Sequence, residues 1–171
     1  EDLFIKRLLC INCKIDLPTM SKKCLKCTND NPESLPLVFD VLQAIVFTRS
    51  YDRLCFIINI YREAFTKQKT DHDINDIVYN RNYEILWDSN SYPFLSILLH
   101  LDGINLGKSN IQCLRILSGS VVELPPAIRI RRQNNLILSL WIGNEQSNIE
   151  LWLYRCFHQL LNLKYEGKSA I

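Results

Sequence analysis

The hydrophobic positions in the first half of the chain predict mainly helical structure. Residues 37–49 (LVFDVLQAIVFTR) are apolar on most sides and predict a short strand that continues as a buried helix. In residues 51–67, apolar side chains recur at steps of three and four, which predicts an amphipathic helix. Residues 67–76 are polar and predict a loop, whereas residues 77–87 mix strand-forming and polar side chains without a clear period.

The period changes to that of strands after residue 92. Three strands are predicted, over Phe94–Leu101, over Cys113–Leu117 with Val121–Leu124 after an interruption at Ser118-Gly119-Ser120, and over Asn135–Ile142. They are apolar on both faces for much of their length, as in a covered sheet. Ser147 and Glu150 then form a capping box that predicts a helix ending near Leu163. The order predicts an α+β fold with a three-stranded antiparallel meander covered by a helix.

Four of the seven cysteines form two close pairs, Cys10 with Cys13 and Cys24 with Cys27. A gap of two residues lets each pair fold as a tight turn that points both sulfurs at one ion, so the spacing predicts a zinc site. Four Cys ligands leave no open position for a substrate, which favours a structural role. So short a segment buries no core of its own, and we expect the metal to supply its folding energy.

The alternatives to a metal site are disulfides and buried free thiols. The odd number of cysteines and the lack of a secretory leader argue against a disulfide framework and favour a reducing, intracellular location. The three remaining cysteines, Cys55, Cys113 and Cys156, lie in apolar stretches, and we expect them to be core residues.

The basic residues gather at two places, although the net charge of +2 is too small to indicate a nucleic-acid binder. The first set lies in the cysteine segment and comprises Lys14, Lys22, Lys23 and Lys26. These lysines can offset the negative charge of zinc with four thiolates, or contact phosphates. The second set, Arg129, Arg131 and Arg132, follows a Pro-Pro break. It can grip a phosphate backbone, or form a solvated hairpin tip.

Candidate catalytic groups are few. Asp102 ends an apolar strand and precedes Gly103, a pair that favours a hairpin turn; alternatively its carboxylate helps to hold a divalent metal, with His100 on the same face. The segment 103–109 is similar to a phosphate-binding loop, but has three residues rather than four between its glycines and precedes a predicted strand. His72 lies between two aspartates without a second ligand cluster nearby, which favours a solvated loop.

Three segments together resemble cut-and-paste transposases of the CACTA and Kyakuja–Dileera–Zisupton type. They are HLDGINLGKS at 100–109, VELPPAIR at 122–129 and NNLILSLWIG at 134–143. Asn75-Asp76-Ile77 followed by Tyr83, and a cysteine-pair module ahead of the core, are similar too. The resemblance covers about residues 10–163, and Lys108 and Ser109 match family positions. Cys113 stands where these proteins commonly have Trp.

The resemblance implies an incomplete ribonuclease H-like fold in which Asp102 is the first catalytic acid. The family's second and third acids lie on a later strand and helix, and Glu123, Glu150 and Glu166 do not match their positions. One carboxylate cannot hold the pair of Mg²⁺ ions that such chemistry needs, so we do not expect this chain alone to cut DNA. Because residue 1 is Glu, we expect the chain to be part of a longer protein.

The sequence therefore predicts a zinc-binding module at 1–32, a helical linker segment at 33–88 and a partial ribonuclease H-like core at 89–171. Two functions follow as hypotheses. The first is a nuclear, DNA-binding and structural part of a transposase. The second is a domesticated protein–protein interaction module with a structural zinc site. An incomplete core exposes a sheet edge, so a protein partner or self-association is expected, and no apolar run reaches the roughly 18–20 residues of a membrane span.

Overall fold

The computed structural model describes residues 3–10, 12–13, 15–18, 23–27, 36–67, 76–90, 93–106, 112–143 and 148–166. The strands are β1 (Phe4–Leu8), β2 (Leu37–Val41), β3 (Ile97–Asn105), β4 (Cys113–Val121) and β5 (Asn135–Gly143). The helices are α1 (Gln43–Lys67), α2 (Arg81–Ser89), α3 (Pro126–Arg129) and α4 (Ile149–Glu166), with 3-10 turns η1 (Ile77–Tyr79) and η2 (Arg132–Asn134). The predicted α+β class is confirmed.

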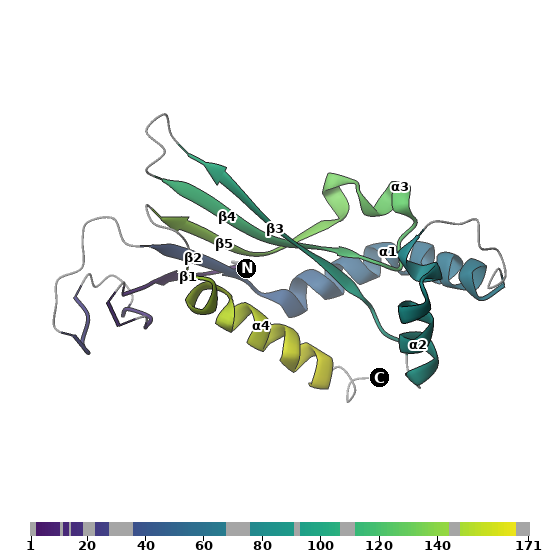
Figure 1. Ribbon diagram of the computed structural model, residues 1–171, viewed down its shortest axis with the longest axis horizontal. Coiled ribbons are helices and arrows are strands. Elements are labelled where there is room, and N and C mark those ends of the chain that lie inside the picture. Colours follow the sequence, from purple (N-terminus) through teal and green to yellow (C-terminus); the bar gives the residue numbers. More distant parts are fainter. Residues whose placement is uncertain are drawn as a thin grey trace. The chain divides into compact units, whose positions relative to one another are not determined.

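The strands form one antiparallel sheet in the order β1-β2-β5-β4-β3 (Figure 1). The meander predicted from the sequence is its β5-β4-β3 part. The sheet extends beyond β5 through β2, where Val38 faces Trp141, and then through β1, where Lys6 faces Phe39. The sequence pattern predicted only a short strand for β2 and none for β1.

The second strand of the meander corrects one expectation. The sequence predicted a break at Ser118-Gly119-Ser120, but β4 runs without interruption through these residues and ends at Val121. Ser118 and Ser120 are buried there. Because β4 has a neighbouring strand on each side, its backbone groups are paired in the sheet and small residues do not end it.

The chain divides into two compact units. Unit 1 comprises Glu1–Val46, His100–Ser118 and Ile137–Ile171, and unit 2 comprises Phe47–Leu99 and Gly119–Leu136. Among the described residues, no helix is both long enough and apolar enough to cross a membrane.

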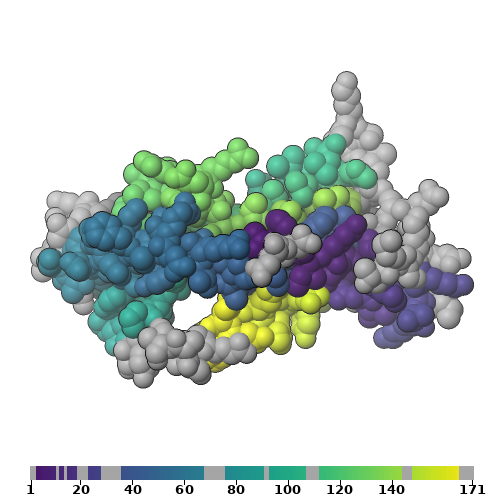
Figure 2. Space-filling model, turned by 180° about the vertical axis from the view of Figure 1, so that it is seen from behind, coloured from purple at the N-terminus to yellow at the C-terminus, as the bar shows by residue number. Residues whose placement is uncertain are grey.

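The core of unit 1 lies between α4 and the strands β2 and β5. Trp152 and Cys156 of α4 are fully buried, and the Trp152 ring packs against Trp141 of β5 at 6.4 Å between centroids. Figure 2 shows α4, in yellow, beside the purple N-terminal strand. Of the three cysteines expected in the core, Cys156 is buried, whereas Cys55 and Cys113 are half-buried.

Helix α4 begins one residue later than the capping box predicted. The side chain of Asn148 accepts a hydrogen bond from the backbone N–H of Leu151 at 3.2 Å, which is an N-cap interaction. Ser147, the expected cap, lies outside the described residues. The helix continues to Glu166, past the expected end at Leu163.

An aromatic cluster forms the core of unit 2. Phe65 of α1 packs edge-to-face on Tyr79, Tyr83 and Trp87, with ring centroids 5.4, 5.8 and 6.2 Å away. Phe94 closes the cluster over Trp87 at 5.7 Å. The two helices predicted over 37–49 and 51–67 are one continuous helix, α1, which brings Phe65 to this cluster.

The segment without a clear period, 77–87, is helical because polar side chains cap its two turns. Asp76 accepts from the backbone N–H of Ile77 at 2.6 Å, and Asn80 accepts from that of Asn82 at 2.9 Å. These caps satisfy backbone donors that have no partner within a helix. The aromatic residues of this segment then face Phe65.

Candidate metal centre

The first cysteine pair lies on a tight turn directly after β1. Leu17 donates its backbone N–H to Leu8 at 2.8 Å, and Cys10 donates to Ile15 at 2.9 Å, so the chain turns back on itself. Cys13 lies on this turn, and its backbone N–H donates to the Cys10 sulfur at 3.4 Å. The two-residue gap thus places both sulfurs on one side of a short loop.

The second pair, Cys24 and Cys27, lies on another turn and meets the first. All four Sγ atoms lie within 4.8 Å of one another, and those of Cys10 and Cys27 are 3.7 Å apart. Zinc bound by four thiolates at about 2.3 Å in a tetrahedron requires sulfurs about 3.8 Å apart. The donor set and its spacing therefore fit one tetrahedral metal ion with thiolate ligands.

The cysteines are themselves the interior of this segment. Cys10 and Cys24 are buried, Cys13 and Cys27 are half-buried, and Leu17 is the one further buried side chain of their cluster among the described residues. So small an apolar cluster gives little hydrophobic stabilisation. The four cysteines are therefore placed to hold an ion, which would add to the stability of the segment when bound.

The turns also set the protonation of two of the thiols. The pKa of Cys24 is lowered to about 6, chiefly because the backbone N–H of Cys27, with that of Lys26, donates to its sulfur. The pKa of Cys13 is raised to about 12, mainly by its hydrogen bond with Cys27 and then by burial. Cys24 is thus ready to bind as a thiolate at neutral pH, whereas an incoming ion must displace the proton of Cys13.

Of the lysines predicted to contact phosphates, the structure describes Lys23 and Lys26. Both are exposed, and each adjoins a cysteine of the second pair. Lys14 and Lys22 lie outside the described residues, as do Lys108, Ser109 and His72 of the other candidate motifs.

The three arginines after the Pro-Pro break have different environments, because Arg129 ends α3 whereas Arg131 precedes η2 and Arg132 begins it. Arg131 and Arg132 are exposed. Arg129 is buried and forms a bidentate ion pair with Asp76, with Nη1–Oδ1 at 2.6 Å and Nη2–Oδ2 at 2.8 Å. Its Nη2 also donates to the backbone carbonyl of Leu124 at 2.8 Å. The guanidinium of Arg129 is therefore engaged inside unit 2.

Asp76 gathers several donors in unit 2. Besides Arg129, the hydroxyl of Tyr61 donates to Oδ2 at 2.5 Å. Burial of the Asp76 carboxyl opposes its ionisation, but the bonds from Arg129, Tyr61 and the Ile77 backbone outweigh burial and lower its pKa. The same burial, with the nearby negative charge, raises the pKa of Tyr61. Sequence reasoning missed this pair because its members are 53 positions apart.

Glu123 is a second buried acid of unit 2. Burial raises the pKa of its carboxyl, although Tyr83 donates its hydroxyl to Oε1 at 2.9 Å. The backbone N–H of Ser96 donates to both carboxylate oxygens, at 2.9 and 3.0 Å. These contacts tie α2 and the start of β3 to the segment after β4.

Asp102 lies within β3 and is exposed, so the hairpin turn considered at Asp102-Gly103 is wrong. Its Oδ1 accepts the backbone N–H of Gly103 at 2.7 Å. A side chain at Gly103 would meet Arg115, since a Cβ there would be 2.3 Å from Nη1. Within the part of the chain that the structure describes, the one group of three or more possible metal ligands is the four-cysteine cluster.

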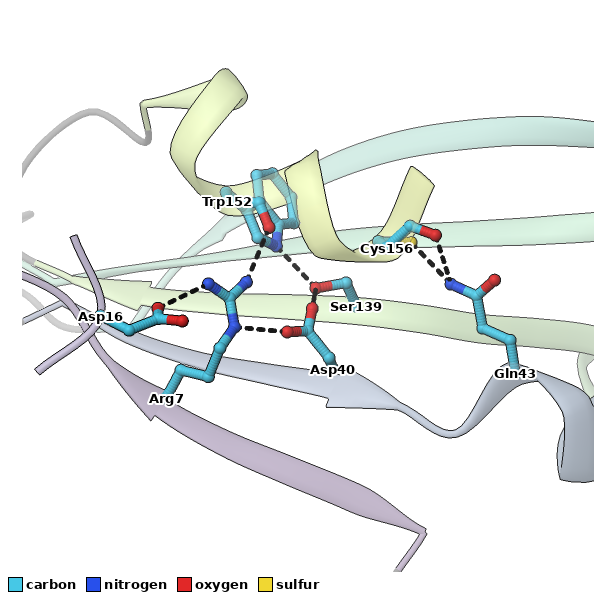
Figure 3. A network of polar contacts seen from close by, with 7 residues as sticks. All are labelled: Arg7, Asp16, Asp40, Gln43, Ser139, Trp152 and Cys156. Atoms are coloured by element: carbon cyan, nitrogen blue, oxygen red, sulfur yellow. Dashed lines mark hydrogen bonds and ion pairs between the residues drawn. The ribbon is translucent and has the colours of Figure 1, made fainter. Parts of the chain in front are cut away.

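A buried polar network joins the cysteine segment to the rest of unit 1 (Figure 3). Arg7 of β1 donates from Nε to Asp40 of β2 at 2.5 Å, from Nη1 to Asp16 at 2.9 Å, and from Nη2 to the carbonyl of Trp152 at 3.1 Å. Burial opposes the charge of Arg7, but its bonds to the two carboxylates outweigh burial and raise its pKa. One guanidinium thus fastens the cysteine segment to β2 and α4.

The network continues from Asp40 across the sheet. Ser139 of β5 donates to Asp40 Oδ1 at 3.0 Å and accepts from the indole N–H of Trp152 at 2.9 Å. Further along α4, Gln43 donates to the carbonyl and the sulfur of Cys156, at 3.1 and 2.9 Å. No local pattern in the sequence indicates this network, whose residues come from the five elements β1, β2, α1, β5 and α4 and from the turn that carries Asp16.

Comparison with known proteins does not assign this chain to a family. No family model, no curated protein and no solved structure matches it.

Proposed function

We propose that Cys10, Cys13, Cys24 and Cys27 bind one structural zinc ion, and that the chain is a DNA-binding, catalytically incomplete part of a cut-and-paste transposase. The observation that carries the zinc proposal is the group of four sulfurs within 4.8 Å of one another. Zinc is the preferred metal because it takes four thiolates in a closed tetrahedral site. When bound, it would hold the two turns together.

The transposase part of the proposal is supported by the order of elements in the second half of the chain. Strands β3, β4 and β5 are consecutive neighbours in the sheet, and helix α4 follows them. The ribonuclease H-like core that the resemblance implies begins with the same order and carries its first acid on the first strand. Asp102 lies on that strand with an exposed side chain.

The residues proposed to contact DNA are the exposed basic ones, Lys23, Lys26, Arg131 and Arg132. The side chains of these four residues are exposed, whereas the guanidinium of Arg129 is buried and held by Asp76. Cutting of DNA would need Mg²⁺ ions and further acids besides Asp102, so this chain alone would bind DNA without cleaving it. The proposed location is the nucleus, where such a protein meets its DNA.

The zinc proposal is tested by metal analysis of the chain purified with added zinc. We expect one zinc ion per chain, lost on treatment with a strong chelator. Cys13→Ser should abolish stoichiometric binding, whereas Cys55→Ser, at a half-buried cysteine outside the cluster, should retain it. A chain that binds no zinc, or a Cys55→Ser variant that loses it, would refute the proposal.

The DNA proposal is tested by binding to duplex DNA across a series of salt concentrations. We expect affinity to fall steeply with salt, and Lys23→Ala/Lys26→Ala to make the logarithmic slope less steep by about 2. Lys67→Ala, at an exposed lysine in the last turn of α1, is the matched control and should leave the slope unchanged. Failure to bind DNA even at low salt would exclude this function while leaving the zinc proposal standing.

A domesticated protein–protein interaction module is the second candidate, and exposed apolar residues of α4 favour it. Tyr154, Phe157, Leu161 and Tyr165 recur at steps of three and four residues and are exposed. Exposed apolar stripes of this kind mark protein interaction surfaces. Absence of DNA binding at low salt would favour this candidate over the first.

A further inference from the structure

Strand β3 is the last strand of the sheet and exposes apolar side chains on both faces. It follows β4 at the end of the strand order, so among the described residues no strand pairs with its outer edge. Every residue from Leu98 to Asn105 is exposed, including Leu98, Leu99, Leu101 and Ile104. An edge strand of this length and composition is a template for pairing with another strand.

The backbone of β3 shows which of its groups face outward. Leu106 donates to Gln112 at 2.8 Å and Val122 donates to Ser96 at 2.9 Å, and both bonds fit one antiparallel register between β3 and β4. Bonding positions alternate in such a ladder, so the even-numbered residues of β3 bond to β4 and the odd-numbered ones point their N–H and C=O groups outward. In agreement, the outward N–H of Gly103 bonds to the side chain of Asp102.

We infer that β3 pairs with β3 of a second copy of this chain, antiparallel and centred on Leu101. In this register Leu101 faces its own copy as a hydrogen-bonded pair, and His100 faces Asp102 twice by symmetry. The His100–Asp102 pairs are non-hydrogen-bonded pairs, in which side chains approach most closely. A cationic or donor imidazole opposite a carboxylate is a favourable cross-strand pair.

The flanking positions fit the same register. Leu98 faces Ile104, so two exposed apolar side chains cover each other on the face that carries His100 and Asp102. On the other face Leu99 is opposite Gly103, over which the side chain of Arg115 from β4 lies. The Gly103 N–H would exchange its bond to Asp102 for a backbone carbonyl of the partner, which frees the carboxylate for His100.

The two neighbouring symmetric registers lack the pairs of opposite charge. Centring the pair on Asp102 puts two carboxylates directly opposite each other, and centring it on His100 puts two imidazoles opposite each other with Asp102 opposite Leu98. Like charges directly opposite in a sheet are destabilising. The sequence of β3 is thus complementary to itself in the register centred on Leu101, and a two-fold axis closes the contact as a dimer.

The test is the dimer dissociation constant of the zinc-loaded chain, measured by sedimentation over a range of concentrations. His100→Asp places two carboxylates opposite each other at both pairs and should raise the dissociation constant at least about tenfold. The swap His100→Asp/Asp102→His restores opposite partners in the same register and should recover most of the affinity. His158→Asp, the same change at an exposed histidine of α4, is the control.

A second pair of variants distinguishes this interface from the apolar stripe of α4. Leu101→Lys puts two ammonium groups on the two-fold axis and should give a monomer, whereas Leu161→Lys should leave the dimer intact. Circular dichroism and thermal unfolding check that each variant is folded. A chain that stays monomeric up to about millimolar concentration, a charge swap that restores nothing, or a dimer lost only with Leu161→Lys would overturn the inference. Zinc content and DNA binding are separate readouts, so their failure does not bear on this result.

Discussion

At the scale of single residues, buried ion pairs connect parts of the chain that are distant in sequence. Arg7 links β1 to Asp40, Asp16 and the backbone of α4, and Arg129 holds Asp76 in the same way within unit 2. Each guanidinium offers several hydrogen-bond donors in a fixed geometry, so one arginine can bond to several segments at once. Removing one member of a buried pair leaves the other charged and without its partner. We therefore expect substitutions in these pairs to lower the free energy of unfolding strongly.

Arg7→Met should lower the free energy of unfolding of unit 1 by about 3–5 kcal/mol, because Asp40 is fully buried and would lose its cationic partner. Arg7→Met/Asp40→Leu should recover most of this loss, since neither buried charge remains. Urea unfolding followed by circular dichroism measures both. Arg131→Ala, at an exposed arginine, should change stability by less than about 0.5 kcal/mol. Equal stability of the Arg7 single and double variants would contradict the pair's role.

The lowered pKa of Asp76 predicts how the stability of unit 2 changes at acidic pH. Its pKa is lowered on folding from the ordinary 3.8, so the unfolded state binds the proton more readily than the folded state. Its contribution to stability is therefore complete above about pH 4 and is lost as pH falls through the lowered pKa. Asp76→Asn should be less stable at neutral pH by about 3 kcal/mol and should show a smaller further loss on acidification.

Unfolding of unit 2 between pH 7 and pH 2, monitored by the fluorescence of Trp87 in a Trp141→Phe/Trp152→Phe background, measures this difference. Asp52→Asn, at an exposed position of α1, should keep the pH dependence of the unchanged chain. An Asp76→Asn variant with undiminished acid sensitivity would show that other groups govern it.

At the scale of elements, caps and neighbours decide where helices and strands begin and end. Helix α4 starts at the cap formed by Asn148, and η1 and α2 start at caps formed by Asp76 and Asn80. β4 continues through small residues because it is paired on both sides, whereas β3 has one outer edge. The pairing proposed for β3 would give that edge the same support.

Asn148→Ala should lower the free energy of unfolding by about 0.5–2 kcal/mol, because the first turn of α4 loses a side-chain acceptor for its backbone N–H. Asn148→Asp should retain the acceptor and the stability. Hydrogen exchange of the first turn of α4 should quicken in the alanine variant alone. Asn162→Ala, nearer the other end of the helix, is the control, and equal losses from both alanine variants would argue against the cap.

At the scale of the whole molecule, the two units have different sources of stability. The cysteine segment of unit 1 has a minimal apolar cluster around its four sulfurs. Unit 2 has an aromatic core of Phe65, Tyr83, Trp87 and their neighbours. We expect the cysteine segment to depend on the proposed ion and the aromatic core of unit 2 not to, so metal removal should separate them.

Chelation of the proposed zinc should release hydrogen-exchange protection at the backbone N–H groups of Cys10 and Leu17. Protection around Phe65 in unit 2 should persist, because the four-cysteine cluster lies in unit 1. Acidification should release the metal as well, since protons compete for thiolates such as Cys24. Identical exchange at Cys10 and Leu17 with and without metal would contradict the dependence.

The metal cluster could be predicted from the sequence because its signal is local. The two-residue gap within Cys10/Cys13 and within Cys24/Cys27 predicts a turn for each pair. The four-sulfur cluster then forms when these two turns lie side by side. The meander and α4 were predictable for a similar reason, since their apolar periods extend over most of each element. Strand β1 (FIKRL) was not predicted from the sequence because two of its five residues are charged. One of them, Arg7, is buried because its charge is paired with residues outside the strand.

The sequence by itself determined the cysteine cluster, the α+β class and the consecutive strands of the meander, because these depend on spacing and periodicity within short segments. Only the tertiary structure decided that β1 and β2 extend the sheet, that Arg129 is buried on Asp76 and that Asp102 lies within an exposed edge strand. Those outcomes depend on contacts between residues far apart in the chain, whose burial and charge no local pattern encodes.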